Sequence, residues 1–287
     1  MLPNFLIVGV QKGGTASLRS YLAQHPDVFV VPKELHYFSS DVNFNRGARW
    51  YESQFAGAGA QKAVGEKTPA YCSSPEAPER IADLLPGVRL IWIFRDPVDR
   101  AYSQYWHSVS KGKEGKRFGR ALELERRHGR KDYVTRGQYC EQVERFLKHV
   151  PRERMLFLMA EELTGNPHRV LRQTCEFLGV GSAHQFTVDS RFNVTHMPRS
   201  ILLQRLGFEF FSRLGRGQVF FRLLNTRSAP GYPPMDPDTH EALYRHYAPY
   251  NERLAEITDL DLSRWQKGAP PAGTSPPTSR ERSRHRA

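Results

Sequence analysis

The stretch FLIVGVQKGGTASLRSYLAQ, residues 5–24, decides the fold. Its first part, Phe5–Val10, is an apolar run rich in β-branched residues, which predicts a strand buried on both faces. The turn Gln11–Gly14 follows, and a helical pattern runs from Thr15 to about Gln24. A strand, a glycine-rich turn and a helix in this order bring backbone N–H groups and the positive end of a helix to one point. The unit therefore predicts a site for a phosphate or another anion.

Further apolar runs extend this unit into a sheet. Strands are expected at Val28–Val31, Arg89–Phe94 and Met155–Met159. Segments with helical spacing or helix-ending signals lie between and after them, at Tyr139–His149, His168–Leu178 and Thr239–Ile257. Helices that alternate with buried strands favour a parallel sheet. The predicted fold class is α/β, a three-layer P-loop-like fold with a central parallel sheet flanked by helices.

The glycine-rich turn departs from the pattern of nucleoside triphosphatases. That pattern, GxxxxGK[ST], has a lysine directly after its second glycine and then a hydroxyl that binds Mg²⁺. Here Gly9 and Gly14 keep the spacing, but Thr15 and Ala16 follow, and the lysine lies earlier, at Lys12. The turn keeps the means to hold a phosphate and lacks the usual magnesium ligands. This disfavours ATP or GTP hydrolysis and favours a metal-free reaction, although a glycine turn also occurs as a plain connection between strand and helix.

A second anion site is expected beside the strand Arg89–Phe94. Arg95 follows this strand directly, at the carboxyl end, where ligands bind in open α/β sheets. Ser103 lies about two turns into the next helix, near enough to share an anion with Arg95. An Arg-Asp-Pro turn also occurs as an ordinary helix-capping ion pair. Together with the first site, however, it suits a donor with phosphates at both ends of a nucleoside.

Four motifs within the first 105 residues resemble those of a known family. They are FLIVGVQKGGTASLRSYLAQHPDV (5–28), KELHYF (33–38), EKTPAY (66–71) and IFRDPVDRAYSQY (93–105). In content and order they resemble the sulfotransferases that use 3′-phosphoadenosine 5′-phosphosulfate (PAPS), especially the branch of the heparan sulfate 3-O-sulfotransferases and their bacterial relatives. Beyond about Tyr139 the similarity is loose.

The resemblance implies an enzyme that moves the sulfuryl group of PAPS onto an acceptor and releases adenosine 3′,5′-bisphosphate (PAP). The acceptor group is expected to be a hydroxyl, less readily an amine, of a saccharide or another small alcohol. Transfer is expected to proceed by in-line attack with a glutamate general base and without a metal. The acceptor itself is not predicted, and neither is the oligomeric state.

The resemblance also assigns roles to single residues. Donor contacts are implied for Lys12, Gly13, Gly14, Thr15, Ala16, Ser17, Arg95 and Ser103. Glu34 matches the glutamate base and His36 a histidine of the same segment; in an extended segment both would point to one face. Lys12 is expected to neutralise charge on the leaving phosphate, and Lys67 to lie near the sulfuryl group. The predicted catalytic residues are therefore Glu34, Lys12, His36 and Lys67.

Simpler interpretations of these residues stay open. Lys33 and Glu34 could form a solvated surface pair, Lys67 could be a surface lysine, and His36 could orient Glu34 or bind the acceptor. Late in the chain the motifs depart from the 3-O-sulfotransferases, because 227–232 (RSAPGY) has neither their cysteine nor their Lys-Gly turn. We expect Arg227 to supply the missing donor contact, with Arg199 as a second candidate.

The net charge of +12, from 42 basic and 30 acidic residues, indicates an anionic partner. Of this charge, +4 lies on residues 266–287, a segment rich in Pro and Ser that we expect to be a disordered tail. The sulfotransferase domain is expected to span residues 1–265.

Two alternative functions stay open. The alternative that is not an enzyme is a protein that binds a polyanion or a nucleic acid, and it predicts that the tail carries the activity; we expect no specific nucleic acid. A small-molecule kinase is the rival among transferases, and it requires Mg²⁺ ligands.

The cysteine content and the hydropathy of the sequence indicate in which cellular compartment the protein is expected. The three cysteines lack metal-ligand spacing and favour a reducing compartment. The beginning of the sequence lacks a signal-peptide pattern, and no stretch has the roughly 20 apolar residues of a membrane span. We therefore expect a cytoplasmic protein. The aromatic and basic segment 208–224 predicts either short helices that pack on the core or a surface for a membrane or greasy acceptor.

Overall fold

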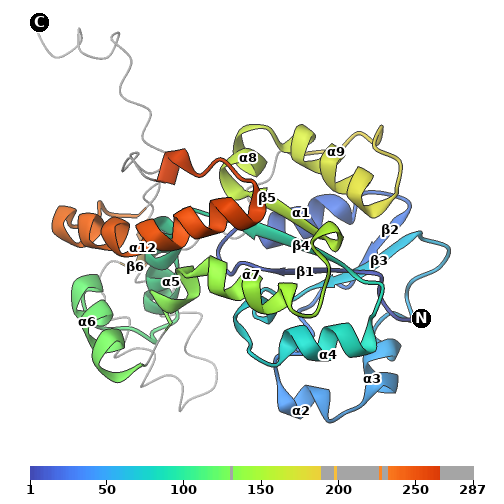
Figure 1. The fold of residues 1–287 in the computed structure, drawn as a ribbon, viewed down its shortest axis with the longest axis horizontal. Helices are drawn as coiled ribbons and strands as arrows, with labels where there is room; N and C mark the ends of the chain where they lie inside the picture. Colours follow the sequence, from blue (N-terminus) through green and yellow to red (C-terminus); the bar gives the residue numbers. More distant parts are fainter. Residues whose placement is uncertain (130–131, 189–196, 199–225, 228–231, 266–287) are drawn as a thin grey trace, which may run out of the picture.

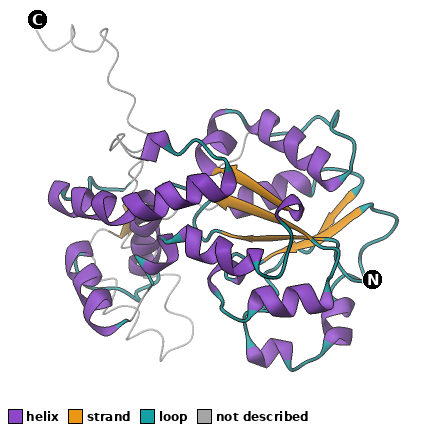
Figure 2. Ribbon diagram, in the orientation of Figure 1, coloured by secondary structure: helices purple, strands orange, loops and turns teal. Residues whose placement is uncertain are grey.

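The computed structural model describes residues 1–129, 132–188, 197–198, 226–227 and 232–265. A parallel five-stranded sheet lies at the centre, with helices on both faces (Figures 1 and 2). Its strands are β1 (Phe5–Gly9), β2 (Val28–Val30), β3 (Ala63–Lys67), β4 (Arg89–Phe94) and β5 (Met155–Met159), in the order β2-β3-β1-β4-β5. The predicted three-layer α/β architecture is confirmed. Because the chain winds to opposite sides of β1, the carboxyl ends of β1 and β4 border the crevice in which such sheets bind ligands.

Two layers of helices cover the sheet. One face carries α1 (Thr15–Leu22), α8 (Ala160–Gly165) and α9 (Pro167–Leu178). The other carries α3 (Ala48–Ser53), α4 (Ala77–Leu84), α7 (Tyr139–Leu147) and the later part of α12 (Pro237–Thr258). Beyond the carboxyl ends of the strands, α5 (Pro97–Ser110) and α6 (Phe118–His128) pack with the earlier part of α12. The remaining elements are short: α2 (Asp41–Phe44), η1 (Tyr71–Ser73), η2 (Thr135–Gly137), η3 (Arg152–Arg154), η4 (Ser263–Trp265), and an antiparallel pair of β6 (Met197–Pro198) and β7 (Thr226–Arg227).

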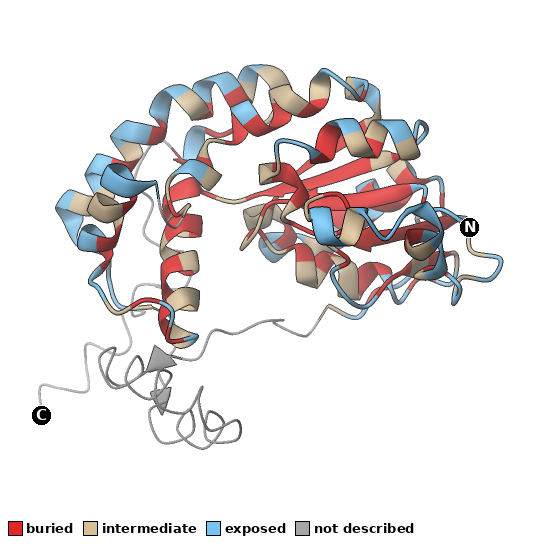
Figure 3. Ribbon diagram, turned by 90° about the horizontal axis from the view of Figure 1, so that it is seen from below, coloured by how far each residue is buried: buried red, intermediate tan, exposed pale blue. Residues whose placement is uncertain are grey.

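Burial on both faces explains why the central strands are continuous apolar runs. On β1, Leu6 and Val8 pack in one hydrophobic cluster, while Phe5 and Ile7 pack in the cluster on the opposite face. All four side chains are fully buried. Figure 3 shows the strands as the buried centre, with helices whose outer faces are exposed. Each such side chain contributes roughly 1.5–3 kcal/mol of burial free energy, so the sheet is a rigid base for the loops at its edge.

Several expected features fall outside the residues that the structure describes. These are Arg199, the segment 208–224 and the tail 266–287. The expected division at residue 265 therefore stays a prediction. Within the described residues, no helix is both long enough and apolar enough to cross a membrane.

Candidate active site

The loop between β1 and α1 packs against the carboxyl end of β4. The N–H of Val10 donates to the carbonyl of Ile93 at 3.0 Å, and the N–H of Gly13 donates to the carbonyl of Val10 at 3.0 Å. A Cβ atom on Gly13 would lie 2.3 Å from the Ile93 oxygen, so only glycine fits there. Gly14, with φ 97°, then leads into α1, whose first turn has no acidic residue. The positive end of α1 therefore borders the loop, as an anion site requires.

Two cations lie at this end of the sheet. Lys12 is half-buried in the loop with φ 71°, and no described carboxylate forms an ion pair with it. Burial, together with the charge of Arg95, lowers the pKa of Lys12 to about 8. Arg95 directly follows β4, and its Nη2 lies 3.6 Å from an oxygen of Asp99. Since an anion between Lys12 and Arg95 would relieve their repulsion, the pair is suited to a phosphate-bearing ligand.

Ser103 lies two turns into α5, as expected, and it is buried. Its hydroxyl oxygen is 3.2 Å from that of Tyr232, a residue to which no sequence motif assigns a role. The start of α5 is fixed by Asp96, whose carboxylate caps the helix and accepts a hydrogen bond of 2.7 Å from Tyr244. Burial raises the pKa of Asp96 to about 6. Arg95 therefore directly precedes a helix start that is fixed by Asp96 and by the contact of Asp96 with Tyr244 of α12.

The side chains of His36 and Lys67 both lie in contact with that of Glu34. The Lys67 ammonium donates to Oε1 of Glu34, and Nε2 of His36 lies 3.2 Å from Oε2. The hydrogen bond from His36, opposed by burial and supported by Lys67, lowers the pKa of Glu34 to about 2. Glu34 in turn raises the pKa of His36. The structure therefore holds one ionised carboxylate between two nitrogen donors.

The geometry of this group corrects two expectations. His36 has φ 49°, in the left-handed region, so the segment turns at His36 and the predicted extended geometry is wrong there. The side chains of Glu34 and His36 meet at this turn. Lys67 is only 9% exposed at the end of β3, which excludes its interpretation as a surface lysine.

Of the other residues that we expect to contact the donor, the structure describes those of α1 fully and Arg227 only by its backbone. Thr15, Ala16 and Ser17 form the first turn of α1, where their backbone N–H groups have no partner within the helix. Arg227 lies on β7, opposite Met197 of β6. Its side chain is outside the described part of the structure, so its donor contact stays a prediction.

Contacts across long stretches of sequence add residues that no local motif indicates. Nη1 of Arg136, in η2, donates to the side-chain oxygen of Gln11 at 2.6 Å, across 125 positions of sequence. Arg136 also pairs with Asp132 at 3.0 Å. His107, on α5, has a pKa lowered to about 4 by burial and then by nearby lysines, of which Lys12 is the strongest. The loop is therefore flanked by a neutral histidine and an arginine.

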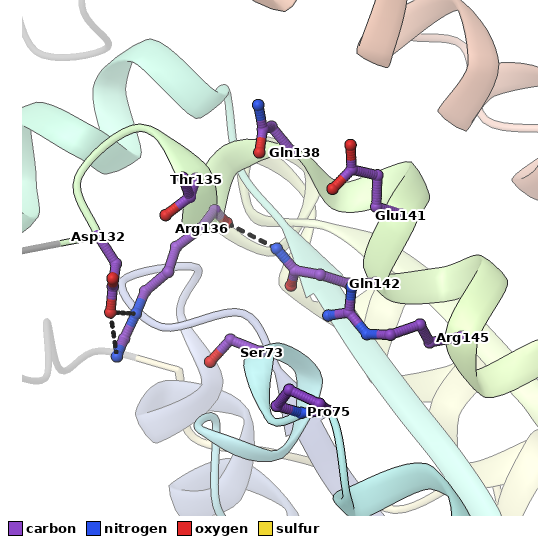
Figure 4. Close-up of a pocket in the computed structure, with 9 residues that line it drawn as sticks. All are labelled: Ser73, Pro75, Asp132, Thr135, Arg136, Gln138, Glu141, Gln142 and Arg145. Carbon is purple, nitrogen blue, oxygen red and sulfur yellow. Dashed lines mark hydrogen bonds and ion pairs between the residues drawn. The ribbon is translucent and has the colours of Figure 1, made fainter. Parts of the chain in front are cut away.

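Arg136 also lines a hollow of about 340 Å³ between η1, η2 and α7. Figure 4 shows its guanidinium turned to Asp132, while the amide of Gln142 bonds to its backbone carbonyl. Ser73 and Arg145 line the same hollow. In this hollow and in the rest of the described ranges, no group of three or more His, Cys, Asp or Glu side chains is arranged to hold a metal ion.

A comparison with protein families decides the assignment. The sequence model described as the sulfotransferase domain matches residues 2–204. The chain belongs to the sulfotransferase family.

Similarity to individual proteins supports the same family. This sulfotransferase is 31% identical over 266 residues to mouse heparan sulfate glucosamine 3-O-sulfotransferase 3B1, covering 91% of this chain and 64% of the relative. It is 31% identical over 268 residues to human heparan sulfate glucosamine 3-O-sulfotransferase 6, covering 91% and 73%. The chain thus spans less than two thirds of the mouse protein. A sulfotransferase of Alicyclobacillus acidocaldarius superposes with a TM-score of 0.72 at 29% identity, over 93% of this chain and 100% of that chain, in agreement with the P-loop-like fold.

Proposed function

We propose that this sulfotransferase moves the sulfuryl group of PAPS to a hydroxyl of a saccharide. The observation that carries the proposal is the pair of cationic positions, Lys12 after β1 and Arg95 after β4, at the same edge of the sheet as Lys67, which ends β3 and pairs with Glu34. A donor with a 5′-phosphosulfate and a 3′-phosphate has two anionic ends, which match two cationic positions. The names of the relatives, which act on the glucosamine of heparan sulfate, support a saccharide acceptor.

In the proposed reaction, the acceptor oxygen attacks sulfur in line with the bridging oxygen of the phosphosulfate. A new S–O bond forms while the bond to the bridging oxygen breaks, and its electron pair leaves on the 5′-phosphate of PAP. The hydroxyl proton passes to Glu34, and the products are a sulfate ester and PAP. The Lys12 ammonium and the N–H groups at the start of α1 stabilise the charge that develops on the leaving phosphate.

The low pKa of Glu34 bears on this step. A carboxylate with a pKa of about 2 is ionised at neutral pH but is a weak base, because Lys67 and His36 already use its lone pairs. We infer that binding of the substrates loosens at least one of these contacts. We infer that the Lys67 ammonium turns towards the sulfuryl oxygens of the donor, which would restore basicity to Glu34 as the acceptor arrives.

Ligand-dependent melting separates this proposal from a magnesium-dependent kinase. PAP in EDTA is expected to raise the melting temperature, by an amount equivalent to about 2.7 kcal/mol at a hundredfold excess over Kd. ADP with Mg²⁺ is expected to leave it unchanged. Stabilisation by ADP with Mg²⁺ and none by PAP would contradict the proposed donor.

We also propose that residues 1–265 carry the whole activity and that Arg227 contributes to donor binding. A chain that ends after Trp265 is expected to keep the wild-type kcat and PAP affinity. Loss of activity in this chain together with undiminished PAP affinity would assign the tail to acceptor binding. Arg227→Ala is expected to weaken PAP binding, and unchanged binding would remove Arg227 from the site.

A further inference from the structure

A completely buried carboxylate lies directly behind the proposed catalytic group. Glu66, on β3 beside Lys67, has no solvent-exposed surface. Its oxygens accept hydrogen bonds from three hydroxyls, those of Tyr51 at 2.9 Å, Thr68 at 2.6 Å and Tyr71 at 2.6 Å. Among the residues that the structure describes, no cation forms an ion pair with it. Burial raises its pKa, and the three hydroxyls, together with the backbone N–H of Leu35, oppose that rise.

Two of these hydroxyls also hold the backbone of the segment that carries Glu34. The Thr68 oxygen accepts from the N–H of Leu35 at 3.1 Å and, more weakly, from that of His36 at 3.4 Å. The Tyr71 oxygen accepts from the N–H of Tyr37 at 3.1 Å. Three consecutive N–H groups, those of residues 35–37, therefore connect through two hydroxyls to a single carboxylate.

The direction of these hydrogen bonds requires an acceptor at Glu66. A hydroxyl has one proton and a backbone N–H group can only donate, so Thr68 and Tyr71, which accept from the segment, must point their protons at Glu66. Their lone pairs then face the backbone N–H groups. A donor at position 66 would turn at least one hydroxyl proton towards an N–H group, and that hydrogen bond would be lost.

This arrangement holds a backbone conformation that the segment does not favour by itself. His36 has φ 49°, and such a conformation in a non-glycine residue persists only where its surroundings hold it. Glu34 lies directly before the anchored residues and reaches Lys67 from there. Loss of the anchors would let the segment relax and would move the Glu34 carboxylate.

We propose that Glu66 is a positioning residue that acts through the hydroxyls of Thr68 and Tyr71. It holds residues 35–37 in the turn that sets Glu34 against Lys67 and His36. The inference rests on the proposed role of Glu34 as base. Donor binding depends on the loop 9–15 and on Arg95, to which residues 35–37 make no hydrogen bond in the described structure.

Tyr51 and Tyr71 supply a matched pair for the test. Both rings are fully buried and both hydroxyls donate to Oε1 of Glu66, but only the Tyr71 hydroxyl also accepts from the segment. Tyr71→Phe is expected to lower kcat on the order of tenfold or more, and Tyr51→Phe less than threefold, as expected for a misplaced catalytic group. Equal losses in the two variants would overturn the proposal.

Thr68 allows a rescue experiment. Thr68→Val keeps the shape and removes the hydroxyl, and it is expected to lower kcat on the order of 10²-fold with PAP affinity within twofold of wild type. Thr68→Ser keeps the hydroxyl and is expected to restore most of the rate. A Thr68→Val enzyme with wild-type kcat, or a Thr68→Ser enzyme as slow as Thr68→Val, would overturn the proposal.

The pH dependence of the rate of Glu66→Gln distinguishes a positioning role from a purely structural one. If Glu34 leaves Lys67 and His36 in the free protein, its pKa rises from about 2, so the acid limb of the kcat/KM profile, which reports the free enzyme, is expected to move to higher pH. An unshifted acid limb, with PAP binding intact, would contradict the positioning role.

Failure of the inference and failure of the proposed function give different results. A slow Glu34→Gln enzyme beside a normal Thr68→Val enzyme would overturn the positioning role and leave Glu34 as base. A normal Glu34→Gln enzyme beside a slow Thr68→Val enzyme would overturn the base, while the segment that carries His36 would still be shown to need its anchors.

Discussion

The two sides of the candidate site treat charge in opposite ways. On the donor side, formed by the loop 9–15 and Arg95, the cations Lys12 and Arg95 repel each other, and no described carboxylate pairs with Lys12. On the acceptor side, formed by residues 34–37 and Lys67, every charge has a partner close by. A cation without a carboxylate partner, such as Lys12, attracts an incoming anion, whereas paired charges fix one another in place. The first side is therefore suited to binding a ligand, and the second to holding one carboxylate in position.

Backbone conformation links the two sides. The described chain has three non-glycine residues with positive φ, and two of them, Lys12 and His36, are predicted catalytic residues. Such conformations cluster at functional sites because the surrounding structure must hold them. The loop packing on β4 holds Lys12, and the hydroxyls behind residues 35–37 hold His36.

The largest effect is expected on the acceptor side. Glu34→Gln keeps the shape of the side chain but cannot take the hydroxyl proton, so kcat is expected to fall by roughly 10²–10⁴-fold. PAP affinity, measured by calorimetry, is expected to stay unchanged. Glu79→Gln, at an exposed position of α4, is the control and should behave as wild type. A near-normal kcat for Glu34→Gln would move the base elsewhere, with His36 as the next candidate.

A change on the donor side is expected to lower both binding and rate. Lys12→Ala removes a cation that is proposed to touch the donor and to stabilise the leaving phosphate. The loss in kcat is expected on the order of 10²–10³-fold, accompanied by weaker PAP binding. Lys33→Ala removes an exposed lysine and serves as the control. If Lys12→Ala reduced kcat alone, like Glu34→Gln, the difference between the two sides would disappear.

The sequence predicts those parts of the fold and of the candidate site that depend on residues close together in the chain. The bounds of β4 and β5 match the prediction at every residue, because both strands are uninterrupted apolar runs. In contrast, β3 was not predicted. Its second half, Gly65–Lys67, is fully enclosed yet reads as polar, since Glu66 and Lys67 face the hydroxyl network and the candidate site.

Contacts between distant parts of the chain could not be predicted. The pairing of Ser103 with Tyr232 and that of Gln11 with Arg136 depend on how α5, η2 and α12 pack. No spacing in the sequence encodes that packing. The left-handed turn at His36 was missed for a similar reason, because the groups that hold it come from residues 66–71.

Arg95 is expected to contribute binding energy alone. Arg95→Ala removes a charge-assisted contact to a phosphate and is expected to weaken PAP binding by about 1.5–3 kcal/mol. Arg89→Ala, at the opposite end of the same strand, is the control. Unchanged PAP affinity in Arg95→Ala by calorimetry would remove Arg95 from the donor site.

The smallest expected effect is a dependence of donor binding on pH. Lys12 has a pKa of about 8 in the free protein, so it is charged below that pH and loses its charge above it. PAP affinity is therefore expected to be level below pH 7 and to fall above pH 8, approaching about tenfold per pH unit. Lys12→Arg, which stays charged, should flatten the profile. An equally steep fall in Lys12→Arg would show that another group titrates.

The most direct test of the central claim is sulfuryl transfer from PAPS labelled with ³⁵S, in EDTA, to a panel of saccharide acceptors that includes heparan sulfate without 3-O-sulfate. The account predicts label on the saccharide, PAP formed in equal amount, and no gain on adding Mg²⁺. A reaction that depends on Mg²⁺, or the absence of both saccharide labelling and PAP formation in a folded protein, would contradict it.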